Sequence, residues 1–424
     1  MKIAVYHDNF ISSGGAEVFA IKTVKALKEL GNQVDLYSCI INEDSFSQVL
    51  DNSNINLTPV LLKCNTIKYN AINIIERTHI LTLYWEFEKI KSKYDIINRE
   101  LKNLKSKYDI IITDDFYSMI PSDLIYFHFP YPVFADSRLT LDNSYDKNMI
   151  KKIYKNILRN KINNEIKNFK KNVLKDWIPF NFVANSTWTK KHMIDIFKEI
   201  ETNDRYNSTM DLTIASNNSK IIYEPVDYET LASNYDPKSK ENIVLTVSRL
   251  EPGKNLWSVV EIASHNPNAN FIIAGTTKTP RASMVLDSLE RLIDKLKTKN
   301  VTIMKDLSRK KLVELYVKAK IYLHPLYIEH FGIAIAEGAS SGAVPVVYRD
   351  GGGWFDIAAK VNQDLGYTNL IEAKSVVKKI IEDHDFWLKL SRKSVDIAKD
   401  FSWNSFKERW NSAVDEIYRI KKDN

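Results

Sequence analysis

The clearest capacity for chemistry lies in residues 329–347, which read EHFGIAIAEGASSGAVPVV. Glu329 and Glu337 are separated by seven residues, and small side chains beginning with Gly332 lie between them. We expect a strand before Glu329, a helix that carries Glu337 and another strand after it. The free N–H groups and the dipole at the start of such a helix suit a diphosphate. The two carboxylates could then hold a sugar and a ribose of one ligand.

Two cations stand in a second segment, SRLEPGKNL, at residues 248–256. Arg249 and Lys254 directly follow an expected strand. Fixed cations at the end of a strand can stabilise the negative charge of a phosphate group. For either residue alone, a surface salt bridge is the ordinary alternative.

Alternating strands and helices must position these residues. The first half begins as strand 2–6, a glycine-containing loop at 12–15, helix 16–30 and strand 34–38. In the second half, the expected strands are 243–248, 271–275, 301–304, 321–325 and 344–348, with helices at 283–298 and 309–319. This order predicts an α/β protein with two doubly wound domains, in which ligands bind beyond the carboxyl ends of the strands.

The two glutamates within this context resemble the signature of retaining glycosyltransferases of family 4. The resemblance implies the GT-B fold: two Rossmann-like domains that face a cleft, with a C-terminal helix that crosses back to the first domain. We expect an acceptor domain at 1–225 with the terminal helix at about 405–424, and a nucleotide-sugar donor domain at 226–404.

Three further segments resemble one subgroup, the lipid-linked oligosaccharide α-1,2-mannosyltransferases. They are YFHFPYP around His128, VANSTWTKKHM at 183–193 and RDGGGWFDIA at 349–358. Alone, His128 would more often be a core histidine. The segment SSGGAE, with Gly14 and Gly15, resembles the family's glycine loop, although two glycines after a strand can mark only a turn. The dinucleotide pattern G-x-G-x-x-G is absent, which argues against NAD binding.

The resemblance implies a role for each site residue. Glu337 would hold the ribose, Arg249 and Lys254 the diphosphate, and Glu329 the sugar hydroxyls, while Gly14, Gly15 and His128 would close over the sugar. The expected donor-binding set also includes His330, Phe331, Gly332 and Ile333. Configuration at the anomeric carbon would be retained, with the departing phosphate oxygen as the base. We name no protein nucleophile, metal ion or cofactor beyond the nucleotide-sugar.

The expected reaction transfers a hexose to a glycan or lipid-linked acceptor hydroxyl, with mannose from GDP-mannose as the preferred donor. A UDP-hexose-dependent exopolysaccharide transferase is the close alternative. A catalytically silent subunit that binds the nucleotide-sugar is the alternative outside enzymes. We expect no nucleic-acid partner, because only one basic stretch suggests it.

Composition sets the broad class. With 44% hydrophobic and 27% charged residues, the chain is that of a soluble globular protein. Its two cysteines, Cys39 and Cys64, predict neither a disulfide framework nor a zinc site and favour a reducing compartment. The first residues read as a strand without a secretory signal, so we expect a cytoplasmic protein.

The net charge of +7 is concentrated at residues 147–175, which hold ten Lys or Arg and one acidic residue. The apolar residues of this stretch fall on one helical face. It is either a solvated surface helix or a site of peripheral attachment to an anionic membrane surface.

Overall fold

The computed structural model describes residues 1–11, 14–53, 55–62, 99–114, 122–129, 182–203, 219–279 and 281–423. The chain divides into two compact units. Unit 1 consists of Met1–Asn185, Thr189–Ile222 and Lys407–Asn424, and unit 2 of Ser186–Trp188 and Tyr223–Phe406. The sequence placed the join after residue 225 and the return to the first domain at about residue 405.

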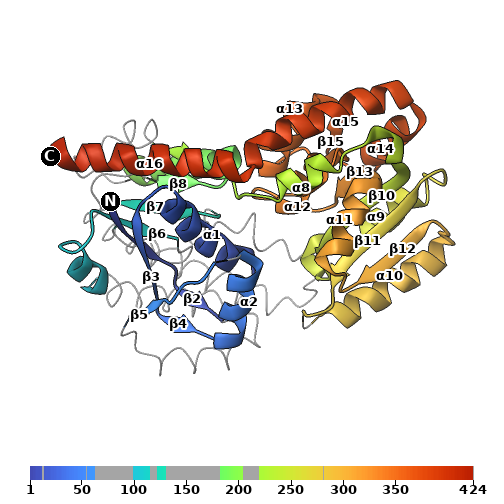
Figure 1. The fold of residues 1–424 in the computed structure, drawn as a ribbon. Coiled ribbons are helices and arrows are strands. Elements are labelled where there is room, and N and C mark those ends of the chain that lie inside the picture. Colours follow the sequence, from blue (N-terminus) through green and yellow to red (C-terminus); the bar gives the residue numbers. More distant parts are fainter. Residues whose placement is uncertain are drawn as a thin grey trace. The chain divides into compact units, whose positions relative to one another are not determined.

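A parallel sheet forms the centre of unit 1 (Figure 1). In their order across the sheet, its described strands are β5 (Val60–Leu61), β3 (Gln33–Ser38), β1 (Lys2–Tyr6), β6 (Ile110–Thr113), β7 (Leu124–Phe127), β8 (Phe182–Ala184) and β9 (Lys220–Ile221). Strands β2 (Asn9–Phe10) and β4 (Ile40–Ile41) form a separate parallel pair. Helices α1 (Gly15–Glu29), α2 (Glu43–Ser53) and α6 (Thr187–Asn203) belong to this half, although α6 begins in unit 2.

The sheet of unit 2 is also parallel. Its order is β12 (Val301–Lys305), β11 (Asn270–Thr276), β10 (Glu241–Arg249), β13 (Ala319–His324), β14 (Val344–Tyr348) and β15 (Gly366–Tyr367). Numbered from the first strand of the unit, this is 3-2-1-4-5-6, the order of the Rossmann fold. The prediction of doubly wound α/β units is confirmed, and the continuous apolar strands suit a sheet that is covered on both faces.

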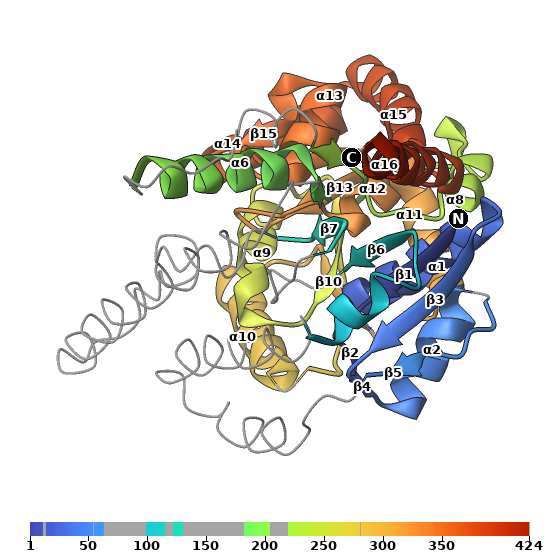
Figure 2. The ribbon, with the colours of Figure 1, turned by 90° about the vertical axis from the view of Figure 1, so that its left-hand side faces the viewer.

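Helices separate these strands along the chain. They are α8 (Tyr228–Ser233), α9 (Trp257–Ala263), α10 (Ala282–Leu296), α11 (Arg309–Lys318), α12 (Ile333–Ser340), α13 (Ala359–Val361), α14 (Leu370–Glu382) and α15 (His384–Ala398). Helices α9 and α10 lie side by side (Figure 2). On α12, a Cβ at Gly338 would come within 2.7 Å of the Tyr322 side chain. Glycine therefore lets α12 lie directly against β13.

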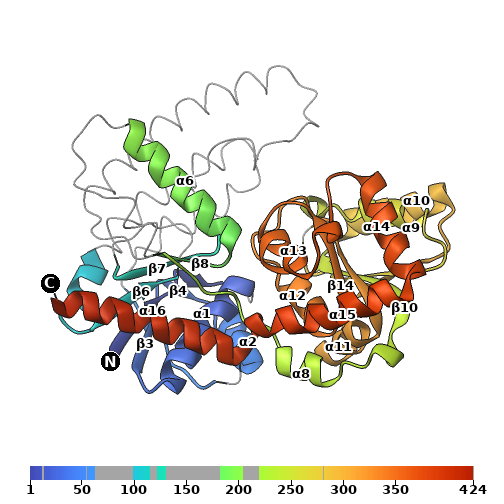
Figure 3. The same ribbon diagram turned by 90° about the horizontal axis from the view of Figure 1, so that it is seen from above.

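The last helix, α16 (Trp403–Asp423), packs on unit 1 through most of its length (Figure 3). Its Arg409 donates to the carbonyl of Ile221, and Lys421 donates to the carbonyl of Asp109. The Trp410 ring lies 6.2 Å from that of Tyr126. These contacts tie the end of the chain to the strands of unit 1.

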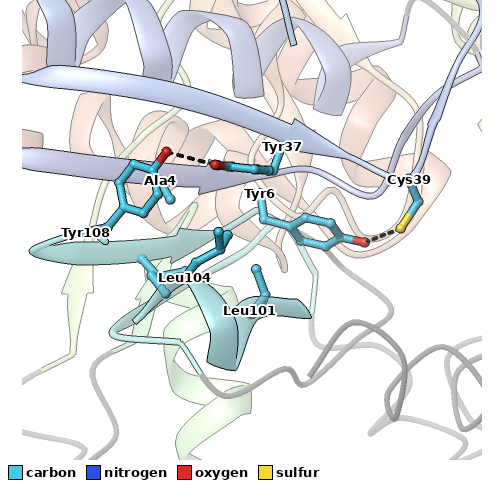
Figure 4. Close-up of a cluster of buried hydrophobic side chains, with 8 residues drawn as sticks. Ala4, Tyr6, Tyr37, Cys39, Leu101, Leu104 and Tyr108 are labelled. Carbon is cyan, nitrogen blue, oxygen red and sulfur yellow. Dashed lines mark hydrogen bonds between the residues drawn. The ribbon is translucent and has the colours of Figure 1, made fainter. Parts of the chain in front are cut away.

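A buried cluster fills the space beside β1 and β3 (Figure 4). The Tyr37 and Tyr108 hydroxyls are 2.8 Å apart, and Tyr6 Oη lies 3.3 Å from Cys39 Sγ. Cys39 is disulfide-bonded, which contradicts the expectation of no disulfide framework and removes the support that the cysteines gave to a reducing compartment. One pair of cysteines needs only a fold that brings them within reach, and their positions in the sequence carry no such information. The other cysteine, residue 64, lies outside the described residues.

Some sequence predictions concern segments outside the described residues: the basic stretch 147–175, and the two serines of the glycine loop at 12 and 13. Where the structure does describe the chain, no helix combines the length and the apolar character that a membrane span requires. The predicted cleft between the domains stays a prediction.

Candidate active site

The strand order of unit 2 reverses between β10 and β13, the position at which open α/β sheets bind ligands beyond the strand ends. Arg249 is the last residue of β10, and His324 is the last residue of β13. Lys254 and Glu329 follow in the two loops. The fold therefore brings one predicted cation and one predicted carboxylate to the same point of the sheet.

In the part of the chain that the structure describes, three polar groups lie beside the carboxylate of Glu329. Its Oε2 lies 3.1 Å from Nε2 of His324 and 3.6 Å from Nζ of Lys254, and its Oε1 accepts a hydrogen bond from the backbone N–H of His330 at 3.2 Å. Burial alone would raise the pKa of the Glu329 carboxyl. The His324 hydrogen bond and the Lys254 charge outweigh burial and hold this pKa well below its usual range. Glu329 is therefore ionised at neutral pH.

A glycine-rich loop after β14 fixes the backbone at Glu329. Glu329 and Gly351 form an isolated parallel bridge, and the N–H of Gly352 donates to the Glu329 carbonyl at 2.7 Å. Gly351 has φ of +91°, and a Cβ there would lie 2.5 Å from the Glu329 carbonyl oxygen. A Cβ at Gly352 would collide with the carbonyl of His330. Only glycine at these positions lets the two loops approach so closely.

The loop after β10 is tied to the loop after β13. Lys254 ends a 3₁₀ turn, Pro252–Lys254, and Asn255 adopts a left-handed conformation with φ of 51°. The Asn255 side-chain amide donates to the carbonyl of Pro325 at 2.9 Å. This contact accounts for the position of Lys254 beside Glu329. Arg249 instead pairs with Glu251 at 3.2 Å, and its side chain is 62% exposed.

Glu337 lies one turn inside α12, and among the described residues it forms an ion pair with Arg309 rather than with Arg249 or Lys254. Arg309 Nη1 is 2.6 Å from Glu337 Oε1, and Arg309 Nη2 is 3.6 Å from Asp227 Oδ2. Arg309 was missed in the sequence, because a cation at the start of α11 has no pattern that links it to Glu337. The two predicted glutamates and the two predicted cations therefore do not form one contact network. Lys254 lies beside Glu329, whereas Glu337 pairs with Arg309.

The remaining predicted donor-binding residues around α12 differ in their surroundings. Gly332 precedes the helix with φ of +98°, and Ile333 begins it. Phe331 is buried, and its ring packs against Tyr223 and Phe401, so its side chain serves the core. The His330 ring lies 5.4 Å from that of Trp188.

Two of the subgroup segments meet in unit 2. The indole Nε1 of Trp188 donates to Asp350 at 2.9 Å. Thr187 donates to Asp356 through both its backbone N–H and its hydroxyl, and the Tyr223 hydroxyl donates to the same carboxylate at 2.9 Å. Burial raises the pKa of Asp356, and these hydrogen bonds only partly offset it. The carboxylates after β14 therefore anchor the short segment Ser186–Trp188 on unit 2.

Unit 1 carries polar residues directly after its neighbouring strands: His7 after β1, Asp114 after β6, His128 after β7 and Asn185 after β8. Nε2 of His128 lies 2.7 Å from Oδ1 of Asp114, and Nδ1 of His7 lies 3.4 Å from Oδ2. Asn185 donates to the carbonyl of His128 at 2.8 Å. The predicted residue His128 is thus held at the strand ends, where the order of this sheet also reverses.

The buried Asp114 carboxylate was missed in the sequence, although a polar residue directly after a buried strand could have indicated it. Burial raises the pKa of Asp114, but the charge and hydrogen bond of His128, with the hydrogen bond of His7, lower it overall. The predicted Gly14 precedes helix α1, and Gly15 begins it. Within the described ranges, no group of three or more His, Cys, Asp or Glu residues is placed to hold a metal ion.

The sequence of unit 2 matches a known family. Residues 227–400 match the family described as glycosyl transferases group 1. These residues form a group 1 glycosyl transferase domain. The domain contains Arg249, Lys254, Glu329 and Glu337, and its predicted relationship is confirmed.

Curated relatives of the chain include two enzymes named GDP-Man:Man(3)GlcNAc(2)-PP-Dol alpha-1,2-mannosyltransferase. That of Neurospora crassa is 24% identical over 258 residues, which cover 56% of this chain and 46% of the relative. That of Dictyostelium discoideum is 23% identical over 245 residues, which cover 54% of this chain and 45% of the relative. The chain spans about half the length of the curated relatives it matches.

Solved structures resemble the whole chain. A glycosyltransferase from Rickettsia africae ESF-5 has a TM-score of 0.61 and 18% identity, covering 100% of this chain and 99% of its own. Anabaena HepE in complex with UDP-glucose has a TM-score of 0.62 and 13% identity, covering 98% of this chain and 100% of its own. The glycosyl transferase domain and unit 1 together therefore have the GT-B fold, as predicted.

Proposed function

We propose that the protein is a retaining, metal-independent hexosyltransferase that moves mannose from GDP-mannose to a hydroxyl of a glycan or lipid-linked acceptor. The observation that carries this proposal is the placement of Lys254 within 3.6 Å of an ionised Glu329 at the switch point of the second Rossmann sheet. A cation and a carboxylate there match two adjacent parts of a nucleotide-sugar, the diphosphate and the sugar hydroxyls.

In this proposal, the glycosyl transferase domain binds the donor. Lys254 and Arg249 contact the diphosphate, helped by the N–H groups at the start of α12. Glu337, oriented by Arg309, accepts hydrogen bonds from the ribose hydroxyls. The exposure of Arg249 leaves its guanidinium able to exchange Glu251 for phosphate, because exposed ion pairs are weak.

The proposed reaction breaks the bond between the anomeric carbon and the phosphate oxygen and forms a bond from that carbon to the acceptor oxygen on the same face. The acceptor hydroxyl proton passes to the departing phosphate oxygen. Lys254 and Arg249 stabilise the charge on the nucleoside diphosphate. Glu329 orients the sugar, and we assign His128 of unit 1 to the transferred sugar as well.

The names of the curated relatives favour GDP-mannose and a lipid-linked glycan, because both appear in those names. A UDP-hexose is the second candidate donor, since the similar HepE structure holds UDP-glucose. A catalytically silent nucleotide-sugar-binding subunit is the third candidate. We further propose a cytoplasmic location, with stretch 147–175 as the contact with an anionic membrane surface; unchanged binding to anionic vesicles after neutralising its lysines would count against that contact.

Thermal unfolding in the presence of GDP, UDP, GDP-mannose and UDP-glucose tests the proposal first, because a ligand that binds only the folded state raises the unfolding midpoint. We expect the guanosine compounds to raise it most. Incubation of GDP-mannose with Man(3)GlcNAc(2)-PP-lipid should then release GDP and lengthen the acceptor. Stabilisation by GDP-mannose without GDP release would support the silent subunit, and no stabilisation by any of the four compounds would reject the proposal.

A further inference from the structure

His324 stands out in the strand that carries it. The strand β13 is buried from Ile321 onward and ends in this histidine, whose side chain is only 7% exposed. A buried imidazole needs hydrogen-bond partners that an apolar residue at the same place would not need. Its presence in a buried strand therefore calls for an explanation beyond packing.

The contacts of the imidazole point to Glu329. Nε2 lies 3.1 Å from Oε2 of Glu329, whereas Nδ1 is buried with no hydrogen-bond partner among the described residues. A nitrogen that faces an ionised carboxylate carries the hydrogen, so in the neutral ring Nδ1 has only its lone pair. The polar chemistry of His324 is thus directed to a single carboxylate.

Neighbouring tyrosines contact both the backbone and the ring of His324. Its backbone carbonyl accepts a hydrogen bond from the Tyr367 hydroxyl at 2.9 Å, and its ring stacks on that of Tyr322. Lys254, the other polar side chain beside Glu329 Oε2, is more exposed, at 23%, and sits on a loop at a longer distance of 3.6 Å. Of the two side-chain partners of Glu329, His324 is therefore built into the sheet, whereas Lys254 can turn away.

We propose that His324 is the positioning residue of Glu329, and that its Nε2–H holds the carboxylate in place when Lys254 turns to the donor diphosphate. This inference rests on the proposed function, in which Glu329 contacts the sugar and Lys254 the diphosphate. Without His324, Glu329 would keep only the backbone N–H of His330 as a fixed hydrogen-bond donor at the moment when Lys254 turns to the diphosphate. The low pKa of Glu329 agrees with this role, because the hydrogen bond from His324 is the foremost influence that lowers it.

Two amide substitutions test the two ring nitrogens of His324 separately. In His324→Gln, the side-chain nitrogen can reach the place of Nε2, whereas in His324→Asn it stays near the place of Nδ1. His265→Asn is the matched control, because His265 is an exposed histidine of the same unit. Each protein is assayed with GDP-mannose and Man(3)GlcNAc(2)-PP-lipid for kcat and the donor KM, and its thermal unfolding midpoint is measured.

We expect His324→Asn to lower kcat on the order of 10²-fold, the loss that a misplaced group can cause, with the donor KM little changed. His324→Gln should recover most of that loss, and His265→Asn should match the wild type. In His324→Asn, the acidic limb of the kcat profile should also move to higher pH. Without the His324 imidazole, the titratable groups that face Glu329 are Lys254 and His330. The loss of the imidazole and its hydrogen bond raises the pKa of the Glu329 carboxyl.

Equal activity of His324→Asn and the wild type would overturn the inference, as would a His324→Gln variant that folds but is no better than His324→Asn. If the variants do not fold, ¹⁵N NMR of the wild type decides: hydrogen on Nε2 is expected, and hydrogen on Nδ1 alone would contradict it. A wild type that neither binds nor consumes GDP-mannose would instead contradict the proposed function. The NMR result would still test the contact between His324 and Glu329.

Discussion

Each of the two sheets has a histidine–carboxylate pair at its strand ends, beside the point where the strand order reverses. The two pairs differ in which member is more deeply buried. In unit 1, the carboxylate of Asp114 is 1% exposed and the His128 side chain 13%. In unit 2, the His324 side chain is 7% exposed and the Glu329 carboxylate 21%. In unit 1 the carboxylate is thus the buried member of the pair, and in unit 2 the imidazole is.

This difference shows that the same kind of pair can orient either an imidazole or a carboxylate. A buried aspartate orients an imidazole in unit 1, and a buried imidazole orients a carboxylate in unit 2. In both cases the buried group orients its partner, and in unit 2 the hydrogen bond of His324 also lowers the pKa of Glu329. Each pair can therefore be tested by changing the buried member and measuring what happens to the exposed one.

Asp114→Asn should have the largest effect. The amide cannot hold His128 as the carboxylate does, so the imidazole loses both its orientation and its charge partner. We expect kcat with GDP-mannose to fall roughly 100-fold. The control is Asp294→Asn, on the exposed side of α10. If Asp114→Asn keeps the wild-type kcat, the pair in unit 1 has no part in turnover.

Gly352→Ala should come second, because a Cβ there would collide with the backbone of His330 and push the loop away from Glu329. We expect the free energy of unfolding to fall by about 1–3 kcal/mol, as in other overpacked sites. Gly253→Ala is the matched control for stability, since its Cβ would meet no heavy atom within 4 Å. Denaturant unfolding of both variants checks the prediction, and equal losses would refute the close-packed loop.

Glu337→Gln should weaken GDP binding about tenfold, because it removes the charge from a hydrogen bond to the ribose. Glu314→Gln is the control, as Glu314 forms a similar ion pair with Lys311 at the surface of the same domain. Titration calorimetry with GDP measures both. A similar affinity for the two variants would show that Glu337 serves only its ion pair with Arg309.

The pH dependence of stability should have opposite signs for two buried aspartates. The pKa of Asp114 is lowered, so its contribution is present above its unfolded pKa near 4 and is lost as pH falls through the lower folded value. The pKa of Asp356 is raised, so its contribution is lost as pH rises through the folded value.

Between about pH 3 and pH 5.5, below the usual titration of histidine, the unfolding free energy of the wild type minus that of Asp114→Asn should therefore increase with pH. The same difference for Asp356→Asn should decrease. Denaturant unfolding at several pH values measures both differences. If the two differences changed with pH in the same direction, the pKa shifts assigned to these two carboxyls would be contradicted.

Much of the fold was predictable because its signals are local. The strand Lys2–Tyr6 was predicted with the bounds that the structure shows, and β10 and β13 differ from their predictions only at the ends. Apolar runs and glycine stops record such elements directly in the sequence. The family resemblance added the two-glutamate motif and the GT-B fold.

The partners of the site residues were not predictable in the same way. Arg309, at the start of α11, pairs with Glu337 on α12. His324 looks like one more residue of a buried strand until its Nε2 is placed beside Glu329. Such contacts depend on where loops end in space, which spacing along the chain does not record. The assignment of Arg249 to the same ligand as Lys254 stays a prediction.

A crystal structure of the full chain with bound GDP tests the donor site most directly. We predict that the diphosphate lies against Lys254 and Arg249 and that the ribose hydroxyls face the carboxylate of Glu337. A nucleotide bound away from the carboxyl ends of β10 and β13, with Lys254 still on Glu329 and Glu337 still on Arg309 alone, would contradict the proposed function.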